Sequence, residues 1–129
     1  MKYLLLVYRA QDALPEPGTP AAQAMLREYT AAVRAMAEAG VLVDCAPLTA
    51  ASAATTVRVR DGQTLLTDGP AAELREQVGG YTIIDYPDLD DALKWAAAMP
   101  AARECSVEVR AIVDVGGGPP GSGHAGGGR

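Results

Sequence analysis

The chain turns sharply within residues 67–80, which read Thr-Asp-Gly-Pro-Ala-Ala-Glu-Leu-Arg-Glu-Gln-Val-Gly-Gly. Gly69 can adopt a positive φ at little steric cost, and Pro70 fixes its own φ while disfavouring the α region for the residue before it. A short helical turn is predicted to start near Pro70, with the carboxylate of Asp68 capping its first N–H groups. The glycine pair at the end of the stretch is expected to close this turn before the next strand.

The same stretch carries three more charged side chains, at Glu73, Arg75 and Glu76. In a helical turn over residues 71–78, Glu73 and Glu76 lie about one turn apart and face the same way. Two carboxylates on one face indicate either a solvated surface or a polar site. Asp68 has a similar pair of interpretations, since it either caps the turn or serves as an acid or base in a site.

A hairpin is predicted immediately before the turn. Residues 55–60 alternate between apolar and polar side chains, with Val57 and Val59 expected to point inward. Asp61-Gly62 is a strong hairpin signal that leads into a second strand over residues 64–67. The hairpin therefore delivers the chain directly to Asp-Gly-Pro.

Two amphipathic helices are predicted elsewhere in the chain. Thr19-Pro20 provides an N-cap and a proline in the first helical position, and the first helix is expected to end at Gly40. The methionine and tyrosine side chains on its apolar stripe are interpreted as core. Asp88 is expected to cap the second helix, which Pro100 ends. Short apolar runs between these helices are predicted to be strands.

The first and last strands differ in pattern. Residues 2–8 are apolar on both faces, which is typical of a central strand covered on both sides. Residues 106–113 alternate, so that the valines share the face toward the helices, and Glu108 and Arg110 lie on the opposite face.

This order of elements predicts an α+β fold of the ferredoxin-like type, a split βαβ arrangement with an inserted β-hairpin. Two helices cover only one face of the sheet, and the other face still carries Leu4 and Leu6. We expect a second copy to cover it, giving a homodimer with paired sheets, a dimeric α+β barrel. The cleft between the sheets would be lined by Tyr8, Glu108 and Arg110, with the Asp-Gly-Pro turn at its rim.

Composition limits the partners and the location. With 129 residues and 49% hydrophobic side chains, the chain is expected to form one domain over residues 1–115 and a disordered tail over residues 116–129, which contains His124, the single histidine. The net charge of −5 disfavours nucleic acid as a partner. The apolar start is too short for a signal peptide or a membrane span, and the two cysteines are interpreted as buried thiols in a reducing cytoplasm. No motif predicts a metal or a cofactor.

Five short motifs occur in order along the chain: MKYLLLVY at 1–8, TTVRVRDG at 55–62, TDGP at 67–70, EQVGGY at 76–81 and SVEVR at 106–110. Together they resemble the YCII-related family, and specifically its DGPF branch, named for an Asp-Gly-Pro-Phe motif. This chain has Ala71 in place of that Phe and contains no Phe. If the Phe fills a pocket wall in relatives, Ala71 is expected to leave a cavity or room for a larger ligand.

The resemblance implies a small-molecule site in the cleft between paired sheets. Some relatives are thought to act as lyases or isomerases through a His-Asp dyad, which cannot be carried over because residues 1–115 contain no histidine. One hypothesis is a cofactor-independent isomerase, cyclase or lyase, with Asp68 as acid or base, Tyr8 as proton donor and Arg110 as the anchor for an anionic group. The predicted binding residues also include Glu108, Ala71, Glu73 and Glu76.

Two other hypotheses stay open. The first is a non-catalytic binding or accessory module, such as a ligand sensor working beside a transcription factor, and the missing histidine, metal motif and nucleophile elbow favour it. The second is structural, with the Glu and Arg side chains holding a dimer together. No part of the sequence names a substrate.

Overall fold

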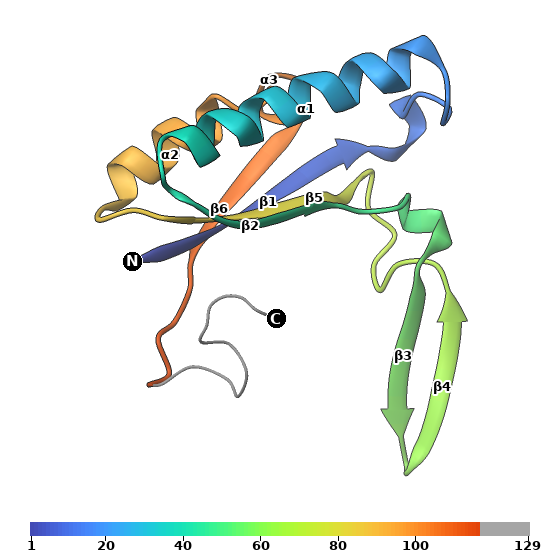
Figure 1. The fold of residues 1–129 in the computed structure, drawn as a ribbon. Helices are drawn as coiled ribbons and strands as arrows, with labels where there is room; N and C mark the ends of the chain where they lie inside the picture. The colour runs from blue at the N-terminus through green and yellow to red at the C-terminus, as the bar shows by residue number, and fades with distance from the viewer. Residues whose placement is uncertain (117–129) are drawn as a thin grey trace.

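The computed structural model describes residues 1–116 and shows an α+β fold (Figure 1). Four strands form an antiparallel sheet in the order β2-β5-β1-β6, and β3 pairs with β4 separately, which is consistent with a ferredoxin-like α+β fold. The predicted tail beyond Gly116, with its histidine, lies outside the described residues. The strands and α-helices are β1 (Lys2–Ala10), α1 (Pro20–Glu38), β2 (Leu42–Pro47), β3 (Thr55–Arg60), β4 (Gln63–Asp68), β5 (Glu76–Asp85), α2 (Leu89–Ala97), α3 (Pro100–Glu104) and β6 (Ser106–Ala111).

The α-helices lie on one side of the four-stranded sheet (Figure 1). α1 begins as predicted, because the Thr19 hydroxyl accepts a hydrogen bond from the N–H of Ala22 at 3.2 Å. α2 also begins as predicted, with the Asp88 carboxylate accepting from the N–H of Asp91 at 2.9 Å. α3 is an addition to the predicted elements. Pro100 ends the preceding segment and also starts this short helix, because proline suits the first helical position.

The hydrophobic core lies between the helices and the sheet. Leu5 and Val7 of β1 are almost fully buried there, together with Met36 of α1. Val107 and Val109 of β6 lie opposite Val7 and Leu5 in the strand register and pack against this core, which confirms the predicted side of the last strand. Both cysteines are free thiols, half-buried and not buried as expected.

The opposite face of the sheet is apolar at its centre. Leu4 and Leu6 of β1 lie across from Ile83 and Tyr81 of β5, and all of these side chains are half-buried. The α-helices of residues 1–116 all lie on the other side. This helix-free face is therefore an apolar surface of the sheet that no α-helix of residues 1–116 covers. No helix within residues 1–116 combines the length and apolar character needed to cross a bilayer.

The predicted helical turn after Pro70 is wrong. Residues 70–75 form an irregular loop, Asp68 ends β4 and caps no helix, and β5 begins at Glu76 and runs through the glycine pair. Pairing of β5 with β1 overrides the local helix preference, and the register shifts by one residue as it passes the pair. Gly69 has a φ of 102°, so the glycine in Asp-Gly-Pro is required by the backbone as expected.

β3 and β4 form a two-stranded arm, defined here as residues 55–68, that extends away from the rest of the molecule (Figure 1). Its tip is the expected turn, in which Asp61 and Gly62 both have positive φ, at 52° and 75°. Val57 and Val59 do not point inward. Each is 59% exposed, because residues 1–116 place nothing against this face of the arm.

Candidate ligand-binding site

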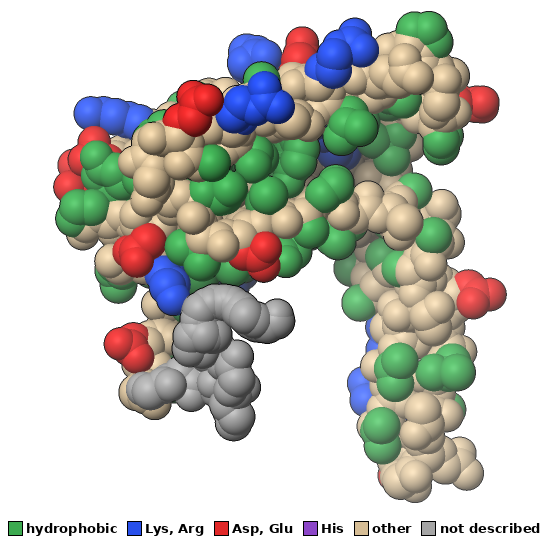
Figure 2. All heavy atoms as spheres, in the orientation of Figure 1, with side chains coloured by type: hydrophobic (Ala, Val, Ile, Leu, Met, Phe, Trp, Pro, Cys, Tyr) green, Lys and Arg blue, Asp and Glu red, His purple; other side chains and the backbone are tan. Residues whose placement is uncertain are grey.

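A cavity of about 850 Å³, the main cavity, lies beneath the N-terminal half of α1. Its other walls are the end of β1, the loop 14–17, the segment 47–52 that includes the start of the 3-10 helix η2 (Ala51–Ala53), and residues between Asp68 and Gly80. Figure 2 shows the surface hollowed between α1 and the base of the arm. Most of the lining is apolar, and includes Val7, Leu14, Met25, Leu26, Leu48 and Val78.

Two glutamines hold the walls of the main cavity in place. The side-chain N–H of Gln11 donates to the carbonyl of Arg9 at 3.1 Å, and its oxygen accepts from the N–H of Ala51 at 3.2 Å. Gln77 donates to the carbonyls of Ala72 and Leu74 at 2.6 and 3.2 Å, which fixes the loop after Pro70. The cavity wall is therefore built before any ligand enters.

The charged groups around the main cavity are mainly acidic. Glu16, Asp68 and Glu73 line it, and Arg9 is its one cationic lining residue within the described chain. The Arg9 side chain is only 11% exposed and pairs with Glu104 at 3.1 Å. Because that charge is already compensated, the cavity favours a neutral or cationic ligand group over an anionic one.

Tyr29 of α1 lines the main cavity and also packs against the core. Its hydroxyl and that of Thr82 are both buried and lie near each other and near Cys45, but neither hydroxyl makes a hydrogen bond of good geometry within residues 1–116. Burial raises the pKa of Tyr29 to about 12, and the neighbouring Cys45 thiol adds to this rise. Tyr29 therefore stays protonated at neutral pH and is a poor general acid.

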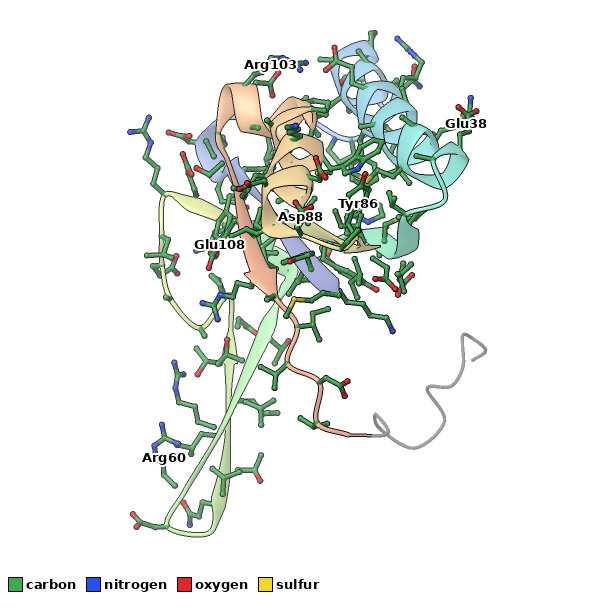
Figure 3. The ribbon with its side chains drawn as sticks, turned by 90° about the vertical axis from the view of Figure 1, so that its left-hand side faces the viewer. Glu38, Arg60, Tyr86, Asp88, Arg103 and Glu108 are labelled. Carbon is green, nitrogen blue, oxygen red and sulfur yellow. The ribbon has the colours of Figure 1, made fainter. Side chains whose placement is uncertain are left out.

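A shallow, open depression of about 420 Å³, the smaller cavity, lies where the end of β1 meets the start of β6 and is lined by Tyr8, Leu74, Glu76, Ser106, Val107 and Glu108. The Tyr8 hydroxyl donates to Glu108 at 2.9 Å, and the Arg110 guanidinium donates to the other oxygen of that carboxylate at 2.8 Å. Ser106 donates to Glu76 at 3.0 Å. Glu108 lies on the outer surface of the sheet (Figure 3).

The electrostatics of this cluster work against acid–base chemistry. The hydrogen bonds from Arg110 and Tyr8 lower the pKa of Glu108, which makes its carboxylate a weaker base. The hydrogen bond to Glu108 raises the pKa of Tyr8, which makes the phenol a weaker acid. The cluster therefore resembles a fixed polar network more than a pair of catalytic groups.

The structure separates the predicted site residues into two groups. Asp68 and Glu73 line the main cavity, whereas Tyr8, Glu76 and Glu108 line the smaller one. The two carboxylates expected on one helical face diverge because Glu73 lies in a loop and Glu76 starts β5. The proposed catalytic pair, Asp68 and Tyr8, is therefore not brought together in one cavity.

The remaining predicted residues lie outside both linings. Arg110 is exposed and bound to Glu108, and Ala71 lies on the surface with its carbonyl accepting from the Arg58 guanidinium at 3.2 Å. A cavity does lie beside the Asp-Gly-Pro motif, but Ala71 does not line it. Within residues 1–116, no group of three or more His, Cys, Asp or Glu side chains is placed to hold a metal ion.

Sequence reasoning missed Gln11, Gln77 and the α1 side chains that line the main cavity. Met25 and Tyr29 fall on the apolar stripe of α1, and the same periodicity describes a core residue and a cavity wall. Gln77 belongs to the EQVGGY motif at 76–81, but only the pairing of β5 with β1 shows that its side-chain amide is placed to hold the loop 70–75.

Comparison with known proteins identifies the family. Residues 1–115 match the model of the YCII-related domain. The chain belongs to the YCII-related family. This YCII-related chain is also 34% identical over 114 residues to an uncharacterized protein from Rhizobium meliloti (strain 1021), a match that covers 87% of this chain and 92% of that protein. The family resemblance seen in the sequence motifs is thereby confirmed.

Proposed function

We propose that this YCII-related protein binds a small organic molecule in the main cavity. The observation that carries the proposal is the cavity itself, of about 850 Å³, apolar over most of its wall and held by fixed amide groups. Small-molecule sites in proteins are typically apolar clefts of about 300–1,000 Å³ with a few fixed polar groups. The acidic lining favours a ligand with an apolar body and a neutral or cationic polar group.

Binding without chemistry is better supported than catalysis. Tyr8 and Glu108 hold each other in protonation states that oppose proton transfer, and they lie apart from the main cavity. A cofactor-independent isomerase, cyclase or lyase stays as a second candidate, because Asp68 places a carboxylate in the main cavity. If a substrate is found, an unchanged turnover rate in Asp68→Asn would exclude that role for Asp68.

We also propose that the protein is a homodimer whose helix-free faces pack together as a dimeric α+β barrel. The half-buried Leu4, Leu6, Tyr81 and Ile83 form an apolar surface that residues 1–116 leave without a helix. Two-fold dimers are the commonest soluble oligomers, and two-fold pairing of identical faces would cover such a surface. The polar network around Glu108 would then lie at the edge of the interface.

The binding proposal is tested with Nile red, a neutral apolar dye, and with native mass spectrometry of freshly purified protein. Ala22→Trp places a bulky ring in the wall of the main cavity, whereas Ala21→Trp places it on the exposed side of the same helix turn. We expect Ala22→Trp to lose at least about tenfold in dye affinity and to retain no co-purified mass, and Ala21→Trp to behave as the parent. Equal dye binding by parent and Ala22→Trp would refute the site.

A further inference from the structure

The arm carries an aliphatic face that the described chain leaves uncovered. Val57, Val59 and Leu66 share one face in the register of β3 and β4, and their exposed fractions are 59%, 59% and 68%. Figure 2 shows hydrophobic side chains along the arm, far from the core. An isolated two-stranded hairpin is at best marginally stable in water. This arm therefore needs a surface to pack against.

The base of the arm is fixed to the Asp-Gly-Pro segment. The Thr56 hydroxyl donates to the carbonyl of Gly69 at 2.8 Å, the N–H of Gly69 donates to the carbonyl of Ala54 at 2.7 Å, and Arg58 donates to Ala71. Thr56 and Arg58 lie on the face of the arm opposite the two valines, and both side chains are thus hydrogen bonded within the chain. Arg60 lies on the same face and extends from the arm into solvent (Figure 3). The direction of the arm is set, and its aliphatic face is what remains for a partner.

The arm points to the side of the sheet that lacks helices (Figure 1). Each strand of the arm has six residues. Such a strand is about 20 Å long, and packed sheets lie about 10 Å apart. The arm is therefore longer than the spacing between packed sheets. If the sheet of a partner subunit stacks on the helix-free face, the arm passes that sheet and runs along the side of the partner subunit.

The interface area also favours a role for the arm. Four strands with about six residues in register give the helix-free face roughly 400 Å². A stable interface buries about 800 Å² on each partner. One face of the arm covers about 200 Å², and in a two-fold dimer each subunit both gives one arm and receives another. Counted as flat footprint, the two arms add about as much contact area as the sheet face itself has, so they bring the interface closer to the size of a stable one.

We infer that the arm clasps a second copy of this chain, with Val57, Val59 and Leu66 packed along the body of the partner subunit. The inference rests on the proposed dimer and adds a second contact to it. A second copy is the occupant because the arm and the helix-free face lie on the same side of the molecule, so one partner covers both. The exposed valines are then interface residues, which explains why they alternate like buried ones.

The test compares dimer dissociation constants by sedimentation velocity over a dilution series. A triple variant, Val57→Thr, Val59→Thr and Leu66→Thr, removes the aliphatic face while placing a strand-favouring, β-branched side chain at all three positions. Leu65→Thr is the matched control, because Leu65 is 44% exposed on the opposite face of the same arm. We expect the dissociation constant of the dimer to rise at least about 100-fold in the triple variant, because each apolar contact that is removed occurs twice in a two-fold dimer. In the control, the dissociation constant should stay within about threefold of the parent.

The possible outcomes distinguish failure of the arm contact from failure of the proposed dimer. A dimeric parent with an unchanged triple variant overturns the clasping arm and leaves the sheet interface intact. A parent that is monomeric at every concentration overturns the proposed dimer, and the arm inference with it. The photoreactive residue p-benzoylphenylalanine in place of Val59 gives an independent readout. Crosslinks to the partner subunit support the inference, and crosslinks confined to one subunit of a dimer overturn it.

Discussion

Replacing Gly80 with alanine is expected to lower the free energy of unfolding by about 1–3 kcal/mol. A Cβ at this position would lie 3.0 Å from the carbonyl oxygen of Ala46 and 3.3 Å from the Cα of Pro47. Both atoms belong to the backbone of β2, which pairs with β5 at this point, so neither can rotate away. β2 must shift, and the hydrogen bond from Leu48 to Gly79, now 2.9 Å, is the first to stretch.

The prediction is measured by urea and thermal unfolding followed by circular dichroism. For a domain of this size the loss corresponds to a fall in Tm of roughly 4–12 °C. Gly79→Ala is the matched control. Its Cβ meets the Cγ of Arg9 at 3.0 Å. The Arg9 side chain is nearly buried and paired with Glu104, but it can turn about its own torsions, which the backbone of β2 cannot do, and alanine also restricts the unfolded chain. We expect the control to stay within about 1 kcal/mol of the parent. A Gly80→Ala protein as stable as the parent, or a control that loses as much, would refute the backbone argument.

Two further changes probe the buried hydroxyl and the polar network. Tyr29→Phe is expected to raise the free energy of unfolding by about 1 kcal/mol, because it removes a buried donor without a partner. A clearly destabilised Tyr29→Phe protein would show that the hydroxyl is satisfied in solution. Hydrogen bonds hold the pKa of Glu108 below its ordinary 4.5, so its contribution to stability is present above that value and is lost as the pH falls through the folded pKa. In unfolding measurements, the parent should exceed Glu108→Gln in stability at neutral pH, and this difference should shrink as the pH falls below 4.5. A difference in stability that does not change with pH would contradict the assignment.

The parts of the fold that were predictable are those set by local geometry. The side chains of a strand alternate by covalent necessity, so the side of the sheet taken by Val107 and Val109 follows from their spacing. Thr19 and Asp88 cap helices because their side chains accept bonds from N–H groups a few residues away. These contacts need no knowledge of the rest of the chain.

The parts that were not predictable depend on contacts between distant segments. Ala-Ala-Glu-Leu-Arg-Glu is a good helix sequence, yet residues 70–75 form a loop because Glu76 and Gln77 pair with the end of β1. That single change moves Glu76 away from Glu73 and places the two carboxylates in different cavities. Asp68 and Tyr8 would act together only in a shared cleft, and the walls of a cleft depend on long-range contacts that the local sequence pattern does not encode.

If both proposals hold, dimer formation and ligand binding are coupled through the Asp-Gly-Pro segment. Gly69 is hydrogen bonded to Thr56 of the arm, and Gly69 also lines the main cavity between Asp68 and Pro70. A partner that holds the arm therefore also restrains one wall of the cavity, and a ligand in the cavity restrains the base of the arm. Because coupling between two binding events is reciprocal, the dye must then strengthen the dimer by the same factor by which dimer formation strengthens dye binding.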